Sequence, residues 1–161
     1  MLSIRDASTA ADLREARTLF EEYAASLDHD LSFQGFQEEL RTLPGKYARP
    51  ERRLLLASWD EALAGCVALR SLESGTCELK RLYVRPAFRA RKIGRALAEQ
   101  VLREAREAGY RKMRLDTLPS MTPAITLYRR LGFHPIDSYR ENPVAGAVFL
   151  ELQLDGRDGE R

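Results

Sequence analysis

The sequence predicts an α/β (α+β) domain in which a mixed, mostly antiparallel central sheet is flanked by about four helices. Three observations support this prediction. Runs with the length and composition of strands follow one another in the first half of the chain, and strands alternate with helices in the second half. Longer stretches repeat apolar residues at helical spacing. The chain has 161 residues, the length of one domain, so we expect a single domain over residues 1–161 with a frayed tail at 155–161.

A strand and two helices are predicted in the first part of the chain. Residues 2–6 alternate apolar and polar side chains, as a strand does. Apolar residues recur every three or four positions from Thr9 to Leu27, which predicts an amphipathic helix. We expect a second helix that is capped by Ser32 and ends at the Pro44-Gly45 pair.

Three closely spaced strands then form a predicted antiparallel meander. The strands are Arg53–Trp59, Ala62–Leu72 and Thr76–Val84, with turns at residues 60–61 and 73–75 between them. This arrangement keeps Cys66 far from Cys77. We therefore expect no disulfide and place both cysteines in the core as small apolar residues.

The remaining elements alternate between helices and strands. Ile93, Leu97 and Val101 repeat every four residues, and Gly109 ends the run, which predicts a helix. A strand at 111–117 should lie parallel to the third meander strand, because a helix connects the two. A shorter helix at 119–131 and strands at 133–139 and 144–154 complete the prediction.

Composition and charge exclude several functional classes. The chain carries 26 Lys and Arg against 24 Asp and Glu, a net charge of +2, which is low for a protein that binds nucleic acid by bulk charge. No apolar stretch approaches the ~20 residues of a membrane span. The N-terminus shows no secretory signal, so we expect a cytoplasmic protein without a membrane partner. His29 and His134 lie far apart and predict no metal site.

The most informative segment runs from Lys80 to Arg95, where seven Lys and Arg residues occur without an acidic residue. It passes from a strand into the first turn of a helix. Free backbone N–H groups and the positive dipole end make such a turn an anion site, and arginine binds phosphate oxygens bidentately. The segment therefore predicts a phosphorylated ligand, with a solvated basic loop as the alternative. Only Tyr83 and Phe88 could stack on bases here, so we expect no nucleic-acid partner.

The spacing within this segment resembles a known signature. Arg89-Ala-Arg-Lys-Ile-Gly94-Arg-Ala is similar to the Arg/Gln-x-x-Gly-x-Gly/Ala pyrophosphate loop of the GNAT family of N-acetyltransferases. Leu82-Tyr-Val84-x-Pro86 ends the preceding strand as in that family, and residues 123–133 resemble its second signature, helix-Leu-Tyr-x-x-x-Gly-Phe. The likeness extends from about residue 4 to residue 154. Two positions depart from the pattern.

The departures are Lys92, in place of the first loop glycine, and Met121, in place of an asparagine that many members carry. We expect a helical backbone at Lys92, because a lysine with positive φ would be strained by about 1 kcal/mol or more. Met121 puts a hydrogen bond to the pantetheine arm of the cofactor in doubt.

The resemblance implies the acyl-CoA N-acyltransferase fold, with its parallel strand pair splayed apart, and acetyl-CoA as cosubstrate. In such proteins the backbone of one splayed strand pairs with the pantetheine amides, and the start of the next helix binds the pyrophosphate. The implied cofactor-binding residues are Leu82, Tyr83, Val84, Arg89, Arg91, Lys92, Ile93, Gly94, Arg95 and Ala96. The resemblance is also consistent with a homodimer.

The implied activity is direct transfer of the acetyl group from acetyl-CoA to a primary amine of a small molecule or peptide. Tyr128 matches the family's general acid, and the Leu82 N–H is the candidate donor to the carbonyl oxygen. Glu78 is the candidate base, directly or through water, because it faces the same side as Leu82 unless a bulge intervenes. Asp116 is a weaker candidate.

Structural roles remain open for the same residues. Tyr128 could be a core aromatic residue, Glu78 a carboxylate paired with Lys80 or Arg81, and the turn at 142–146 only a turn. A catalytically silent acyl-CoA-binding or regulatory module of the same fold is the alternative function.

Overall fold

The chain folds around one open sheet, seen in a computed structural model that describes residues 1–27, 35–142 and 144–155. The seven strands are arranged in the order β1-β2-β3-β4-β5-β7-β6. Their bounds are β1 Leu2–Asp6, β2 Arg53–Trp59, β3 Ala62–Glu73, β4 Thr76–Val84, β5 Lys112–Thr117, β6 His134–Pro135 and β7 Val148–Gln153. Every neighbouring pair is antiparallel except β4 and β5, which are parallel. The predicted mixed, mostly antiparallel sheet is confirmed.

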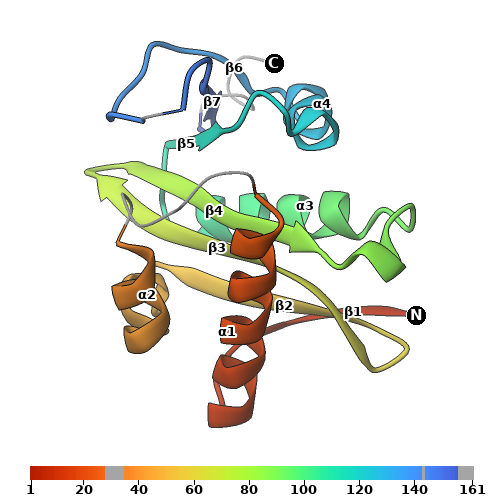
Figure 1. Cartoon of the computed structure of the whole chain (residues 1–161). Coiled ribbons are helices and arrows are strands. Elements are labelled where there is room, and N and C mark those ends of the chain that lie inside the picture. Colours follow the sequence, from red (N-terminus) through yellow and green to blue (C-terminus); the bar gives the residue numbers. More distant parts are fainter. Residues whose placement is uncertain (28–34, 143, 156–161) are drawn as a thin grey trace.

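Four α-helices lie within the described residues, as the sequence predicts. They are α1 Ala10–Ala25, α2 Phe36–Thr42, α3 Ile93–Glu107 and α4 Thr122–Arg130. Figure 1 shows α1 and α2 on one face of the β2–β4 part of the sheet and α3 on the other. Short 3-10 turns at Gly45–Tyr47 and Pro86–Phe88 connect elements. None of the helices in the described ranges has the length and apolar character of a membrane span.

The predicted boundaries hold where a local signal sets them. Thr9 begins α1 through a capping box: its hydroxyl accepts the Asp12 N–H at 3.0 Å, and the Asp12 carboxylate accepts the Thr9 N–H at 3.3 Å. The expected cap at Ser32 and most of the expected tail, residues 156–161, lie outside the described residues. In the part that is described, α2 begins at Phe36 after Gly35, which has φ +71°.

The predicted C-terminal strands are too long. The strand expected at 133–139 is reduced to His134–Pro135, and the one expected at 144–154 begins at Val148. Proline has no N–H for the sheet, so Pro135 weakens the first of them. The intervening segment turns toward β4 and β5, where its side chains contribute to the candidate site.

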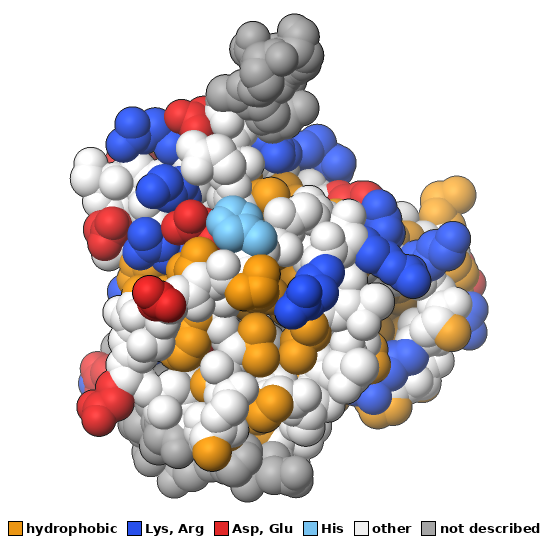
Figure 2. Space-filling view, turned by 90° about the horizontal axis from the view of Figure 1, so that it is seen from above, with side chains coloured by type: hydrophobic (Ala, Val, Ile, Leu, Met, Phe, Trp, Pro, Cys, Tyr) orange, Lys and Arg blue, Asp and Glu red, His pale blue; other side chains and the backbone are white. Residues whose placement is uncertain are grey.

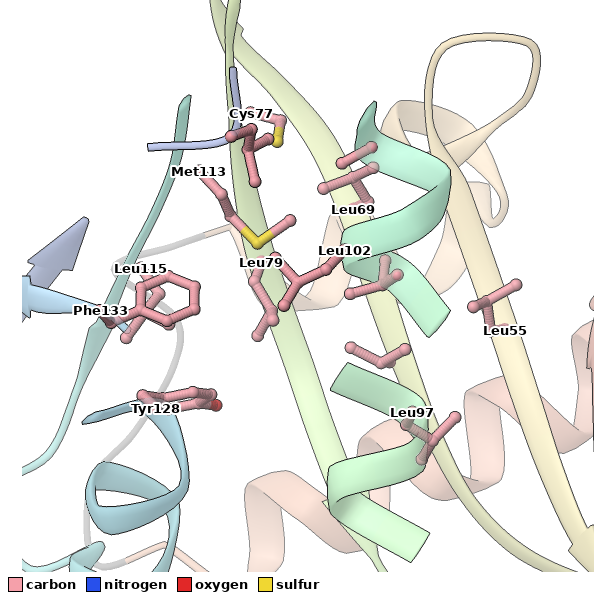
Figure 3. Packing of buried hydrophobic residues seen from close by; sticks show 14 of the residues in the cluster. Leu55, Leu69, Cys77, Leu79, Leu97, Leu102, Met113, Leu115, Tyr128 and Phe133 are labelled. Carbon is pink, nitrogen blue, oxygen red and sulfur yellow. The ribbon is translucent and has the colours of Figure 1, made fainter. Parts of the chain in front are cut away.

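Two hydrophobic clusters cover the two faces of the sheet. One packs α3 and α4 against the sheet, with Leu97, Met113 and Leu115 fully buried (Figure 3). The other packs α1 and α2 against the opposite face. Cys66 belongs to the second cluster and Cys77 to the first, and both are free thiols. The prediction of two core cysteines without a disulfide is confirmed.

Candidate active site

β4 and β5 pair over only three residues of each strand before they separate. Thr76–Glu78 are in register with Lys112–Arg114, and beyond Glu78 the register joins β4 to β3 alone. A cavity lies between the separated strands. Its lining residues are Tyr23, Leu27, Leu79, Lys80, Arg81, Leu82, Leu115, Asp116, Thr117, Leu118, Met121, Tyr128, Asn142 and Val144. This register matches the splayed parallel pair expected from the sequence.

A β-bulge interrupts β4 beside the cavity. Cys66 pairs with Tyr83, but Ala68 pairs with Lys80, so a single β3 residue faces both Arg81 and Leu82. Arg81 has φ +60°, in the left-handed region. The extra residue shifts the alternation of the strand. The exception allowed for in the sequence analysis therefore applies: a bulge intervenes, Glu78 and Leu82 do not share a side, and of the two only Leu82 lines the cavity.

Tyr83 and Val84 are the last residues of the part of β4 that is not paired with β5. The Tyr83 side chain lies in the α1/α2 cluster, where its ring contacts Tyr23 edge-on at 6.0 Å between centroids. Its backbone thus remains the part that could serve a ligand. Gly65 lies opposite Val84 on β3, and a Cβ there would be 2.5 Å from the Tyr83 carbonyl oxygen. Only glycine allows β3 and β4 to approach this closely.

The first turn of α3 lies next to the end of β4 and has no side-chain cap. No acidic residue occurs in this turn, so its N–H groups and dipole present a positive end. The Ala96 N–H donates to the Lys92 carbonyl at 3.1 Å and is therefore occupied by the helix itself. This corrects the expectation for Ala96, whereas the amides of Ile93, Gly94 and Arg95 precede that bond.

The backbone before α3 is left-handed at two non-glycine residues. Lys92 has φ +62° and Ala90 has φ +70°. The expectation of a helical Lys92 is wrong: the loop keeps the conformation that glycine would adopt freely, and lysine adopts it at an energetic cost. The close turn brings the start of α3 back toward β4.

Basic side chains surround this helix start. Arg89, Arg91, Lys92 and Arg95 are exposed. The Arg89 Nε donates to the Val84 carbonyl at 3.0 Å, and the Arg91 guanidinium lies 5.0 Å from the centre of the Trp59 ring. In Figure 2, Lys and Arg side chains gather on the side where Figure 1 places the start of α3. The described surface is thus basic where the sequence predicts a phosphate site.

Tyr128 lies across the cavity on α4. Its side chain is buried, and its ring packs against Phe133 with 5.6 Å between centroids. Burial raises the pKa of the phenol well above its usual value, so the hydroxyl stays protonated. Figure 3 shows the oxygen on the side of the ring that faces β4. The sequence-predicted acid is therefore a protonated donor that lines the cavity.

Glu78 occupies the point where β4 and β5 separate. Its carboxylate is fully buried, accepts the Tyr139 hydroxyl at 2.7 Å, and pairs with Arg70 at 2.9 Å and Arg140 at 2.6 Å. Burial alone would raise its pKa, but the charges of Lys80 and Arg140 and these hydrogen bonds hold it below its usual value. Of the two partners considered from the sequence, Lys80 acts on Glu78 through its charge, and Arg70, Tyr139 and Arg140 are further partners. Glu78 does not line the cavity, and its ion pairs weaken it as a base.

The segment after β6 covers the cavity from the β5 side. Asn142 donates to the Asp116 carboxylate at 3.1 Å, and Arg140 lies 3.6 Å from the same carboxylate. The turn is thus bound to β5 by polar contacts and, through Val144, contributes to the lining.

Lys80 is a site residue that sequence reasoning missed. It lines the cavity, only 6% of its surface is exposed, and burial with the nearby Arg81 lowers its pKa to about 7. In the sequence Lys80 is one of several basic residues in a cluster. Its burial in the cavity could not be predicted, because the β4 bulge beside it has no sequence signal. Among the described residues, no group of three or more His, Cys, Asp or Glu is placed to hold a metal ion.

Comparison with known proteins identifies relatives over most of the chain. A family model described as the acetyltransferase (GNAT) family matches residues 13–133. An uncharacterized N-acetyltransferase of Schizosaccharomyces pombe is 36% identical over 155 residues, which cover 95% of each chain. An uncharacterized N-acetyltransferase of Dictyostelium discoideum is 34% identical and covers 87% of this chain and 94% of its own.

Solved structures show the same fold. A GNAT-family acetyltransferase of Staphylococcus aureus superposes with a TM-score of 0.78 at 20% identity, over 96% of this chain and 99% of its own. The yncA protein of Salmonella typhimurium, solved with its cofactor acetyl-CoA, superposes with a TM-score of 0.69 at 22% identity, over 96% and 94%.

Proposed function

Because the chain belongs to the GNAT family of acetyltransferases, we propose that it transfers the acetyl group of acetyl-CoA directly to a primary amine of a small molecule or peptide. One observation carries this proposal. The cavity between the separated ends of β4 and β5 lies beside an uncapped, basic start of α3, so a single elongated ligand can reach both places.

The residues present fit coenzyme A. Backbone groups of Leu82, Tyr83 and Val84 lie on the stretch of β4 that β5 leaves unpaired and can bond the pantetheine amides. The amides from Arg91 to Arg95 can bind the pyrophosphate at the helix start. Arg89 and Arg91 are exposed beside it and supply phosphate contacts.

Bound acetyl-CoA supplies an activated acetyl group as a thioester, and the chain supplies hydrogen bonds and proton transfer. We propose the Leu82 N–H as the donor to the thioester carbonyl oxygen, where negative charge develops. Tyr128, protonated and lining the same cavity, protonates the leaving thiolate. The role of Glu78 as the base, through water, remains a prediction. Lys80 and Asp116 also line the cavity and carry titratable groups there.

Free-thiol release from acetyl-CoA against a panel of amines, amino acids and peptides tests the activity. We expect thiol release with at least one class of amine. A silent acyl-CoA-binding module of the same fold would instead bind acetyl-CoA and release no thiol with any acceptor in the panel.

Gly94→Glu tests the cofactor site. A Cβ at Gly94 would lie 3.7 Å from the Val84 side chain and 4.0 Å from Leu127, so a glutamate there projects a negative charge into the groove proposed for the pyrophosphate. We expect acetyl-CoA to raise the melting temperature of the wild type and to leave that of the variant unchanged. Ala108→Glu places the same side chain at the far end of α3 and should retain the shift. An equal shift in both variants would contradict the assigned site.

A further inference from the structure

The bulge in β4 places Leu82, the proposed carbonyl donor, in the cavity. Arg81 holds the left-handed φ of +60° that makes the bulge. This conformation is unfavourable for arginine, so it persists only if the surroundings fix it. A bulge that relaxed into regular pairing would shift the alternation of β4 by one residue and turn the Leu82 N–H away from its present direction.

A buried ion pair joins this residue to α2. The Arg81 Nε and Nη2 atoms donate to the two carboxylate oxygens of Glu39 at 2.9 Å and 2.8 Å. Both side chains are 2% exposed. The Phe36 ring lies 5.3 Å from the guanidinium carbon, and the Lys46 Nζ lies 3.4 Å from the Glu39 carboxylate. The two parallel hydrogen bonds fix the plane and direction of the guanidinium.

A second contact holds the backbone of the same residue. The Cys66 thiol donates to the Arg81 carbonyl oxygen at 3.3 Å. Arg81 is thus held at its side-chain end by α2 and at its backbone by β3. Removing the charge of either member of the ion pair alone would leave the other charge buried without this pair of hydrogen bonds.

We propose that the Glu39–Arg81 pair is a positioning device for acetyl transfer: it holds the β4 bulge so that the Leu82 N–H meets the developing oxyanion. Glu39 and Arg81 act through the backbone and are positioning residues. This inference rests on the proposed function and adds to it a role for α2, which otherwise lies outside the cavity.

The double variant Glu39→Met/Arg81→Met separates positioning from stability. A buried ion pair can often be replaced by apolar side chains of similar volume without loss of stability. Methionine, however, cannot form the two parallel hydrogen bonds (the fork) that join Arg81 to Glu39. We expect the melting temperature and the Kd for coenzyme A to stay near the wild-type values, and kcat to fall by about 100-fold, the loss typical of one misplaced oxyanion donor. KM for the amine should change little. The preference for acetyl-CoA over coenzyme A in binding should also fall.

A second bidentate pair, whose side chains are 30% and 35% exposed, provides the control for the loss of a fork-shaped ion pair. Glu22 of α1 and Arg85 after β4 form the same fork at 3.0 Å and 2.8 Å, outside the bulge. Glu22→Met/Arg85→Met should keep kcat within about twofold. If the Glu39/Arg81 double variant also kept kcat within twofold, the pair would be structural only and the proposal overturned.

A milder variant covers the case in which the double variant does not fold. Glu39→Asp keeps the charge but withdraws the carboxylate by one methylene, so the fork cannot close. We expect at least a tenfold loss of kcat with an unchanged Kd for coenzyme A, and retained kcat would overturn the proposal. A wild-type protein that releases no thiol with any amine would instead refute the proposed function.

Discussion

At the scale of single residues, burial decides what Tyr128 can do. A phenol whose pKa is raised by burial is a better hydrogen-bond donor than proton acceptor at neutral pH. We expect Tyr128→Phe to lower kcat by about 10²- to 10⁴-fold, because it removes the proton donor. The ring contact with Phe133 is kept, so the Kd for acetyl-CoA should stay within about twofold. Steady-state kinetics and a binding titration measure the two effects.

Tyr110→Phe is the control for this change. Tyr110 is a half-buried tyrosine at the other end of α3, outside the cavity lining. It should keep full kcat. A Tyr128→Phe enzyme as fast as this control would show that Tyr128 is a core aromatic residue and that another group protonates the thiolate.

The residue types of the site could be predicted from the sequence, but their orientation could not. Tyr128 and the basic loop follow from motifs of neighbouring residues. The role of Glu78 depends on Tyr139 and Arg140, which are about 60 positions away, and on a bulge that no local pattern announces. Period-two reasoning fails there because one extra residue reverses the alternation.

At the scale of elements, the start of α3 contains a residue in an unfavourable backbone conformation. A positive φ at Lys92 carries an energetic cost, and for that reason the sequence predicts a helical backbone there. Lys92 has φ +62° immediately before the helix. A residue with a Cβ is unfavourable in this conformation by about 1–2 kcal/mol, whereas glycine adopts it freely. This backbone explains why the family usually has glycine at this position. Lys92 adopts the same left-handed conformation, at the energetic cost that glycine avoids.

The left-handed backbone at Lys92 predicts that glycine is more stabilising than alanine there, the reverse of their order inside a helix. We expect Lys92→Gly to be more stable than Lys92→Ala by about 1 kcal/mol in the free energy of unfolding. At Arg103, an exposed position inside α3, Ala should instead be more stable than Gly by about 1 kcal/mol. Denaturant titrations of the four variants measure both differences. The same order at both positions would mean that Lys92 is not left-handed in solution.

Regular elements were predictable because their signals are local. The strands Arg53–Trp59 and Thr76–Val84 are confirmed to the residue, since alternation and turn residues define them. The strands expected near the C-terminus were too long, because Tyr139, Arg140 and Asn142 bind Glu78 and Asp116 instead of extending the sheet.

At the scale of the whole molecule, the two parts of the sheet are joined where β4 meets β5. Three register pairs connect these strands, and the rest of the junction opens into the cavity. A polar cluster closes the joined end: Glu78 on β4 bonds Tyr139 and Arg140, and Arg140 approaches Asp116 on β5. The cavity between β4 and β5 is therefore bounded at one end by this cluster of buried, charged side chains.

This cluster predicts a stability that depends on pH. Glu78 has a lowered pKa in the folded protein, so its contribution is present above its unfolded pKa, near 4.5, and is lost as the pH falls through the lower folded value. Arg140→Met should lower the free energy of unfolding by about 1–3 kcal/mol at pH 7, because Glu78 then loses a charged partner. The difference from the wild type should shrink as the pH falls below 4.5.

Arg129→Met makes the same substitution at an exposed position of α4. It should change the free energy of unfolding by less than about 0.5 kcal/mol at either pH, as expected for a surface site. Denaturation of both variants and the wild type at pH 7 and at pH 4 and below provides the comparison. A loss in Arg140→Met that is the same at every pH would mean that Arg140 acts by packing alone. The junction of the two half-sheets would then depend on its three register pairs rather than on the charge of Glu78.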